Sequence, residues 1–252
     1  MHVVAVIQAR TGSTRLPGKV LYPLDGEHVL THDVRRLRAA ETVDEVVVAT
    51  STSDPDDAVA EAAERADATV YRGSESDVLG RMYGAVEEAG ADVVVRATGD
   101  DPLVSPAAVN AVGEAVVDGA DYAGNTIDRT FPQGLIIEAV SMPSLRAVES
   151  TATEPHHREH VTQYHLENPD SFECRNVVWS DVYGWEPALG RDEVRLALDE
   201  PADYELLRRV YDGVEYDERG ILPVRSAIEY VDREGLASVN LAVEQTKVQG
   251  DE

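Results

Sequence analysis

Short apolar runs alternate with longer amphipathic stretches along the first 120 residues of the chain. The apolar runs predict β-strands over 3–8, 45–50, 69–71 and 92–97. The amphipathic stretches predict helices over 28–40, 54–66, 76–89 and 106–117. Because the apolar runs are nearly unbroken in Val and Ile, we expect strands that are buried on both faces of a mostly parallel sheet. The pattern therefore indicates an α/β protein with a three-layer, Rossmann-like arrangement.

The second half of the chain is less regular. It predicts strands within 121–142, at 173–179 and at 194–198, and helices at 144–149, 156–167 and 201–211. No internal repeat, low-complexity segment or linker interrupts it. We therefore expect a single domain over 1–239, followed by a polar tail over 240–252.

The loop after the first strand concentrates groups that bind anions. Its cations, glycines and one of its hydroxyl side chains are Arg10, Gly12, Ser13, Arg15, Gly18 and Lys19. Glycine lets the backbone come close to an anion, and the cations neutralise its charge. The spacing is not that of a Walker A loop, because five residues separate Gly12 from Gly18 and Val20 follows Lys19. We interpret the loop as a triphosphate cradle, with a basic surface loop as the alternative.

Two acidic residues follow predicted strands and are candidates for holding Mg²⁺. Asp100 comes after the strand at 92–97, and Asp199 comes after the strand at 194–198, just before a helix that begins with Pro201. Mg²⁺ prefers oxygen ligands and commonly takes one or two carboxylates together with substrate phosphates. The alternative is that either residue only caps a turn or a helix.

The loop forms part of a longer motif. Residues 8–19 read Gln-Ala-Arg-Thr-Gly-Ser-Thr-Arg-Leu-Pro-Gly-Lys. This run resembles the signature loop of the sugar nucleotidyltransferases. It is most similar to that of the cytidylyltransferase family that includes the spore coat polysaccharide biosynthesis protein SpsF and the acylneuraminate cytidylyltransferases. The resemblance implies a nucleotide-diphospho-sugar transferase fold, with a nucleotide-binding half over 1–120 and an acceptor-binding half over 121–239.

Further segments extend the resemblance to a nucleotide pocket and its metal. Residues 98–103 read Thr-Gly-Asp-Asp-Pro-Leu, where the family carries Thr-Gly-Asp-Cys-Pro-Leu and uses the first Asp as a Mg²⁺ ligand. Residues 49–51 and 72–79 are similar to the family's Ala-Thr-Ser and Arg-Gly-Ser-x-x-Asp-Val-Leu. The resemblance implies Mg²⁺ held by Asp100 and Asp199. The nucleotide contacts that it implies are Gln8, Ala9, Gly12, Ser13, Thr50, Ser51, Arg72, Gly73, Asp77, Arg96 and Gly99.

Three segments of the second half are similar to the family's acceptor-binding motifs. Residues 121–125, 132–138 and 158–162 resemble Asp-Tyr-x-x-Asn, Pro-x-Gly-x-x-x-Glu and Arg-Glu-His-Val-Thr. The acceptor contacts that this resemblance implies are Asn125, Gly134, Glu138, Arg158, Glu159 and His160. For Arg158, two roles are equally open: binding a carboxylate or phosphate of the sugar, or pairing with an acid on a helix.

Histidines in this region raise the question of zinc. His156 and His160 stand four residues apart, a spacing that brings two imidazoles onto one helix face. No third ligand is spaced to complete such a site, and Glu159 is not placed as in His-Glu-x-x-His. We therefore do not expect zinc at this pair.

The reaction implied by the resemblance is nucleotidyl transfer. A sugar hydroxyl or phosphate would attack the α-phosphate of CTP, and Lys19 with Arg10 and Arg15 would offset the charge on the leaving pyrophosphate. A glycosyltransferase of similar fold is one alternative, but it should carry Asp-x-Asp, whereas Asp100 and Asp101 are adjacent. A catalytically silent nucleotide-binding module is the other. The resemblance also implies a possible homodimer.

The net charge and the composition of the chain limit the partners and the cellular compartment that we expect for it. The formal net charge of −26 argues against binding nucleic acid, whose phosphates would be repelled. Lys19 and Lys247 are the only lysines and the acids are spread over every predicted helix, which favours adaptation to high salt over a basic partner. The single Cys174 cannot form an intramolecular disulfide, and no apolar run reaches the roughly 18 residues of a membrane span. Because the chain starts with a strand and not with an apolar leader, we expect a cytoplasmic protein without membrane insertion.

Overall fold

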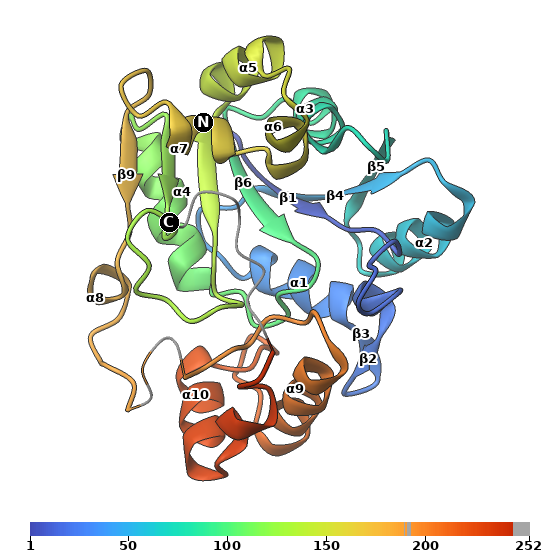
Figure 1. Cartoon of the computed structure of the whole chain (residues 1–252), viewed down its shortest axis with the longest axis vertical. Helices are drawn as coiled ribbons and strands as arrows, with labels where there is room; N and C mark the ends of the chain where they lie inside the picture. The colour runs from blue at the N-terminus through green and yellow to red at the C-terminus, as the bar shows by residue number, and fades with distance from the viewer. Residues whose placement is uncertain (189, 191–192, 244–252) are drawn as a thin grey trace.

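A seven-stranded sheet forms the centre of the computed structural model, which describes residues 1–188, 190 and 193–243 (Figure 1). Across the sheet the strands follow in the order β5 (Thr69–Gly73), β4 (Glu45–Ser51), β1 (Val3–Gln8), β6 (Val93–Thr98), β8 (Glu138–Ser141), β7 (Tyr122–Gly124) and β9 (Cys174–Asn176). Neighbouring strands pair in parallel, except that β8 runs antiparallel to both β6 and β7. The predicted mostly parallel sheet is confirmed.

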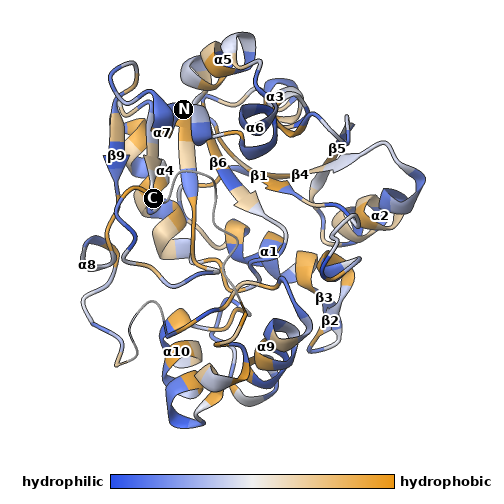
Figure 2. Cartoon of the chain, viewed as in Figure 1, coloured by the Kyte–Doolittle hydropathy of each residue, from blue (hydrophilic) through white to orange (hydrophobic). Residues whose placement is uncertain are grey.

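Helices cover both faces of the sheet and complete three layers. Alternate residues of β1 divide between two apolar cores, with Val3, Ala5 and Ile7 in one and Val4 and Val6 in the other. Apolar residues run along the strands and the helices that flank them (Figure 2). The larger core includes residues of α1 (Val29–Arg38), α2 (Asp57–Arg65) and α4 (Pro106–Val117). The smaller core includes residues of α3 (Val78–Glu88) and α5 (Met142–Thr151).

C-terminal helices extend the larger core and meet the beginning of the chain. They are α9 (Pro201–Gly213), α10 (Val224–Arg233) and η3 (Leu236–Val239). α9 packs on a small hairpin of β2 (Pro23–Leu24) and β3 (Glu27–His28). There the Tyr204 hydroxyl donates to the Pro23 carbonyl at 2.7 Å, and the Tyr204 ring meets the Tyr22 ring edge-on. The hairpin that follows the first loop of the chain therefore lies against α9. Two further short helices are η2 (Asp54–Asp56) and α8 (Trp179–Val182).

Two segments differ from the elements predicted for them. The continuous helix expected over 156–167 is wrong, because the chain forms α6 (Pro155–His160) and α7 (Gln163–Glu167) with a break at Val161. Val161 has φ of 52°, which a β-branched residue rarely adopts. The strand expected over 194–198 is also wrong, since Arg195 makes only an isolated bridge to Gln133. Helical or strand periodicity does not reveal such breaks, because tertiary contacts impose them.

The predicted polar tail falls mostly outside the described residues, which end at residue 243. Asn240, at its start, is buried. Within the described ranges, no helix is long and apolar enough to cross a membrane.

α1 carries a carboxylate into the larger core. Asp33 is 1% exposed, and among the described residues neither of its carboxylate oxygens has a hydrogen-bond partner. Burial, reinforced by the nearby charges of Asp101 and Asp100, raises the pKa of Asp33 well above its usual range. Arg36, one turn further along the helix, donates instead to the Val104 carbonyl at 2.6 Å. The folded protein therefore favours the neutral form of Asp33.

The Asp33→Asn substitution is expected to stabilise the fold increasingly as the pH rises. The stability linked to a raised carboxyl pKa is fully present below the ordinary carboxyl pKa, and it is lost as the pH rises through the folded-state pKa. Asn keeps the shape of Asp and never ionises. Thermal unfolding in molar KCl should show the Tm of the variant rising relative to the unsubstituted protein as the pH is raised above the ordinary carboxyl range. The exposed Glu88→Gln should show no such trend, and a constant Tm difference for Asp33→Asn would contradict the assignment.

Candidate active site

Two adjoining cavities form a cleft at the carboxyl ends of β1 and β6. Their volumes are about 400 Å³ and about 380 Å³. The residues that line both cavities are Gln8, Arg10, Arg15, Asp100, Glu159 and Asp199. Ligands of parallel α/β sheets bind at this edge. The cleft therefore brings the predicted cationic loop opposite the two predicted metal carboxylates.

A carboxylate from the β4–α2 connection anchors the cationic loop. Asp56 accepts hydrogen bonds from the Thr11 backbone N–H at 2.7 Å and from the Thr11 hydroxyl at 2.8 Å, and also from the Ser51 hydroxyl. Further along, Gly18 has φ of 71°, in the left-handed region that favours glycine, and its N–H donates to the Thr11 carbonyl at 2.9 Å. This turn leads directly into η1 (Lys19–Leu21), so that Lys19 lines the smaller cavity.

The Lys19 ammonium lies between the two predicted metal carboxylates. Its Nζ is 2.5 Å from Asp100 Oδ2 and 2.7 Å from Asp199 Oδ1, and the residue is only 9% exposed. Burial lowers the pKa of Lys19, but the charges of Asp100 and Asp199 outweigh burial and leave the pKa raised. The three charges come from the first loop, the end of β6 and the start of α9, which only the fold brings together.

The carboxylates of Asp100 and Asp199 fit a small, hard cation. Each directs one oxygen at the same cationic atom, so a single ion in that region would reach both. Carboxylate oxygens are ligands that Mg²⁺ prefers. The neighbouring Asp101 does not belong to this pair, because its carboxylate accepts from the Thr98 hydroxyl at 2.7 Å. Burial, with the nearby Asp100 charge, raises the pKa of Asp101 to about 8.

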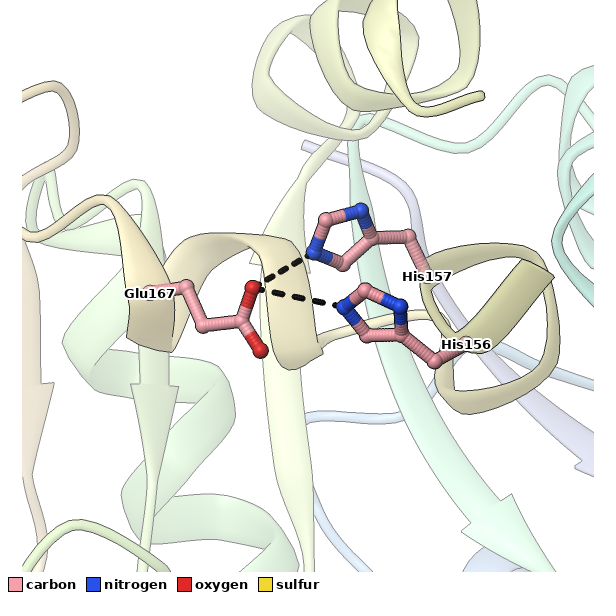
Figure 3. A group of neighbouring side chains, drawn as sticks. All are labelled: His156, His157 and Glu167. Atoms are coloured by element: carbon pink, nitrogen blue, oxygen red, sulfur yellow. Dashed lines mark hydrogen bonds and ion pairs between the residues drawn. The ribbon is translucent and has the colours of Figure 1, made fainter. Parts of the chain in front are cut away.

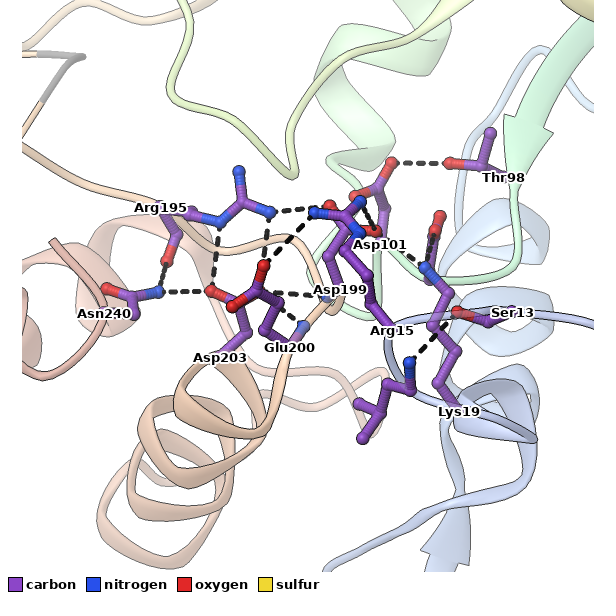
Figure 4. Close-up of polar contacts among 12 residues, drawn as sticks. Ser13, Arg15, Lys19, Thr98, Asp101, Arg195, Asp199, Glu200, Asp203 and Asn240 are labelled. Atoms are coloured by element: carbon purple, nitrogen blue, oxygen red, sulfur yellow. Dashed lines mark hydrogen bonds and ion pairs between the residues drawn. The ribbon is translucent and has the colours of Figure 1, made fainter. Parts of the chain in front are cut away.

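A buried network holds Asp199 in place (Figure 4). Arg195 Nη2 lies 2.6 Å from Asp199 Oδ2, and Arg195 Nε lies 3.0 Å from Asp203 Oδ1. Asp203 is fully buried, caps α9 by accepting the N–H groups of Asp199 and Glu200, and also accepts from the Asn240 side chain at 2.8 Å. Sequence analysis did not single out Arg195 or Asn240. The only signal was an arginine inside the apolar segment 194–198, which marks a buried charge but not its partner.

Arg15 completes the cationic surroundings of Asp199. Its Nη2 lies 3.2 Å from Asp199 Oδ1, and its Nη1 lies 3.5 Å from Glu200 Oε1. The charges of Lys19, Arg15 and Arg195 hold the pKa of Asp199 below its usual range, although burial alone would raise it. Asp199 is therefore ionised in the folded protein.

A second network reaches the cleft from β6 and β8. Arg96 Nη1 lies 2.5 Å from Glu138 Oε2, and Arg96 Nε donates to Gln8 Oε1 at 3.3 Å. Glu138 also accepts from the hydroxyls of Tyr122 at 2.8 Å and Thr162 at 3.0 Å. With 4% of its surface exposed, Glu138 stabilises the position of Arg96 from behind.

The residues predicted to contact the nucleotide fall into two groups. Those that line the cleft are Gln8, Ala9, Gly12, Ser13, Arg96 and Gly99. Those that are not among the residues lining the two cavities are Thr50, Ser51, Arg72, Gly73 and Asp77. In the second group, Arg72 donates to the Ser51 carbonyl at 2.9 Å and pairs with Asp57 at 2.6 Å. This group supports the connection after β4, and its contact with a nucleotide stays a prediction.

The predicted acceptor residues are also divided. Glu159 and His160 line the cleft. Asn125 is fully buried, and its side chain donates to the Leu135 carbonyl and accepts from the Ile137 N–H, both at 2.9 Å. Its amide therefore holds two backbone segments, and its contact with an acceptor stays a prediction.

Two further acceptor candidates have structural partners. Arg158 pairs with both carboxylate oxygens of Asp77 at 2.6 and 2.8 Å, so the fold adopts the ion-pair alternative and fastens α6 to the start of α3. Gly134 has φ of 93°, and a Cβ there would lie 2.3 Å from the Ala197 nitrogen. Glycine at this position lets the chain before Asp199 approach closely.

Fold and cleft together define a nucleotide-binding class of α/β protein, in which a cationic loop after the first strand faces a pair of carboxylates. The comparisons with known proteins give the family. The sequence matches the cytidylyltransferase family over residues 4–220, and the chain belongs to this family.

Similar proteins support the assignment over nearly the whole chain. The chain is 34% identical over 239 residues to an uncharacterized protein from Methanocaldococcus jannaschii, covering 92% of this chain and 91% of that protein. It is 33% identical over 215 residues to the spore coat polysaccharide biosynthesis protein SpsF from Bacillus subtilis, covering 83% and 86%. A solved structure of a cytidylyltransferase from Leptospira borgpetersenii serovar Hardjo-bovis aligns with a TM-score of 0.84 at 28% identity, covering 98% and 99%. The predicted resemblance and the nucleotide-diphospho-sugar transferase fold are confirmed.

The Asp203→Ala substitution is expected to destabilise the fold by about 3 to 5 kcal/mol, because it removes one of the two carboxylates that pair with the buried Arg195 and leaves the Asn240 amide without this acceptor. Chemical denaturation in molar KCl measures this free energy of unfolding. The matched control is Asp212→Ala on the same helix, where the carboxylate pairs with Arg208 at an exposed position. That variant should lose less than about 1 kcal/mol. Equal losses for both variants would show that the Arg195 network does not stabilise the cleft.

Proposed function

We propose that this chain transfers CMP from CTP to a sugar acid or a sugar phosphate with release of pyrophosphate, and so supplies an activated sugar for polysaccharide synthesis. The observation that carries the proposal is the meeting of Lys19, Asp100 and Asp199 in the cleft of a cytidylyltransferase-family chain. In-line transfer of a nucleotidyl group depends mainly on positioning and on charges around the phosphates. The similarity to SpsF supports the polysaccharide setting.

In this proposal Asp100 and Asp199 hold Mg²⁺. When bound, the ion supplies electrostatic stabilisation of the charge on the α-phosphate. Lys19, Arg10 and Arg15 neutralise the charge on the leaving pyrophosphate, which is the role expected of cations fixed around a transferring phosphoryl group. Arg195 keeps the Asp199 carboxylate directed into the cleft.

A negatively charged acceptor suits the larger cavity. Its lining carries six arginines against three acids, in a chain whose net charge is −26. Arg96, Arg129 and Arg195 line only this cavity, and guanidinium groups are well matched to carboxylate and phosphate. Glu159 and His160, which lie on α6, offer hydrogen bonds to sugar hydroxyls. These features favour an acid sugar or a sugar phosphate over a neutral sugar.

Pyrophosphate release tests the proposal directly. The full chain is assayed in molar KCl with Mg²⁺, using each of the four nucleoside triphosphates against a panel of nonulosonic acids and sugar phosphates. Molar salt is chosen because we attribute the net charge of −26 to function at high ionic strength. Release with CTP and one acceptor supports the assignment and names the substrate. Consumption of a ready-made nucleotide sugar, without pyrophosphate release from any pair, would move the chain to glycosyl transfer.

The Lys19→Ala variant is expected to lower kcat about 10²- to 10³-fold, because a fixed charge at the reacting phosphates is lost. The assay uses saturating Mg²⁺, and circular dichroism checks that the fold is intact. Arg225→Ala, at an exposed position on α10, is the control and should retain kcat. An unchanged kcat in Lys19→Ala would remove this residue from the mechanism.

Adjacent carboxylates allow a matched test of the metal assignment. Asp100→Ala is expected to abolish Mg²⁺-dependent turnover, whereas Asp101→Asn should retain it, because Asp101 is bonded to Thr98 and lies outside the pair. Initial rates measured against Mg²⁺ concentration distinguish the two variants. Full activity of Asp100→Ala would discard the metal assignment.

A further inference from the structure

Two adjacent histidines and a glutamate converge on one point away from the residues that line the cleft (Figure 3). His157 Nε2 lies 2.6 Å from Glu167 Oε2, and His156 Nε2 lies 3.5 Å from the same oxygen. The three ligand atoms all lie within 4.8 Å of one another. The histidines come from α6 and the glutamate comes from the end of α7.

The break at Val161 brings these residues together. Val161 has φ of 52° and ψ of −63°, and the Thr162 N–H donates to the His160 carbonyl across it. This is a γ-turn with positive φ, a strained conformation that a valine adopts only when its surroundings impose it. The turn folds α7 back so that Glu167 meets α6. Glu167 thereby joins His156 and His157, a grouping that the sequence spacing does not show. His160 lines the cleft instead.

Neighbouring side chains orient the cluster. The Gln163 side chain donates to Glu167 Oε1 at 3.0 Å, which leaves Oε2 directed at the two imidazoles. The Tyr164 ring meets the His157 ring edge-on, with ring centroids 5.0 Å apart. Such supporting contacts are what fixes carboxylate and imidazole ligands in metal sites. His157 is buried, whereas the side chains of His156 and Glu167 are 46% and 38% exposed, so solvent reaches one side of the cluster.

We propose that His156, His157 and Glu167 form a binding site for a divalent transition-metal ion of the zinc class. Two imidazole nitrogens and one carboxylate oxygen are a ligand set that Zn²⁺ accepts, with the exposed side open to water. The bound ion replaces the hydrogen bond between His157 and Glu167. It bridges α6 and α7 on either side of the Val161 turn, and so stabilises the segment that carries Glu159 and His160 into the cleft. The site does not depend on the proposed function.

Co²⁺ and Zn²⁺ titrations of the tag-free, metal-stripped full chain test the site. We expect one Co²⁺ per chain with visible d–d absorption, displacement of Co²⁺ by Zn²⁺, and a rise in Tm when Zn²⁺ binds the folded chain. His156→Ala and Glu167→Gln should abolish this absorption. Gln163→Ala should weaken Co²⁺ binding about 10- to 100-fold, because it removes the hydrogen bond that orients the Glu167 carboxylate. His156 and Glu167 are partly exposed, so both ligand variants are expected to fold.

Two controls separate this site from other places where metal binds. In Asp100→Ala the Co²⁺ absorption should persist, which distinguishes the cluster from the cleft carboxylates. His2→Ala removes another histidine beside a glutamate, with His2 Nε2 lying 3.9 Å from Glu45 Oε2, and it should leave binding unchanged. Absence of Co²⁺ absorption in the unsubstituted chain would overturn the proposal. So would absorption that survives in His156→Ala and Glu167→Gln, or absorption that disappears in Asp100→Ala.

Discussion

The contact of the Lys19 ammonium with Asp100 and Asp199 is the interaction on which the cleft depends. The half-buried carboxylates of Asp100 and Asp199 both contact Lys19 Nζ. Without a cation between them the two carboxylates would repel one another, whereas each attracts the ammonium. The contact joins the first loop, the end of β6 and the start of α9 at one point. Two neighbouring residues fix the position of Asp199. Arg195 contacts the second carboxylate oxygen of Asp199, and Gly134 leaves room for the segment just before Asp199. Any ion that binds these carboxylates competes with Lys19 for them.

The whole chain has an excess of acidic residues, whereas the lining of the larger cavity has an excess of arginines. The chain carries 48 acidic residues against 22 lysines and arginines, yet the larger cavity is lined by twice as many arginines as acids. In concentrated salt the repulsion among exposed acids is screened, while the partly buried pairs of the cleft are screened much less. The residues that line the larger cavity therefore carry a local excess of arginines, although the whole protein is strongly negative. This contrast depends on arginines held by buried partners, as Arg96 is held by Glu138.

One strained residue links two features of the second half. Because the helix breaks at Val161, α6 can direct Glu159 and His160 into the cleft while α7 returns Glu167 to His156 and His157. The same turn lets the Thr162 hydroxyl reach Glu138, which supports Arg96. A continuous helix would separate these contacts. The positive φ of a buried valine is therefore maintained by the polar contacts on both sides of it.

The sequence by itself determined the alternation of strands and helices, the parallel sheet, the cationic loop and the family, because each depends on neighbouring residues in the chain. It also made Asp100 and Asp199 candidates for holding a metal ion, because both stand at element ends where local pattern is informative, and their role as metal ligands stays a prediction. Only the tertiary structure decided that Lys19 lies between them and that Arg158 pairs with Asp77. Tertiary structure also decided that residues 156–167 form two helices and that Arg195 and Asn240 belong to a buried network. These outcomes depend on hydrogen bonds and charge pairs between side chains that lie far apart in the chain, and local periodicity does not encode such contacts.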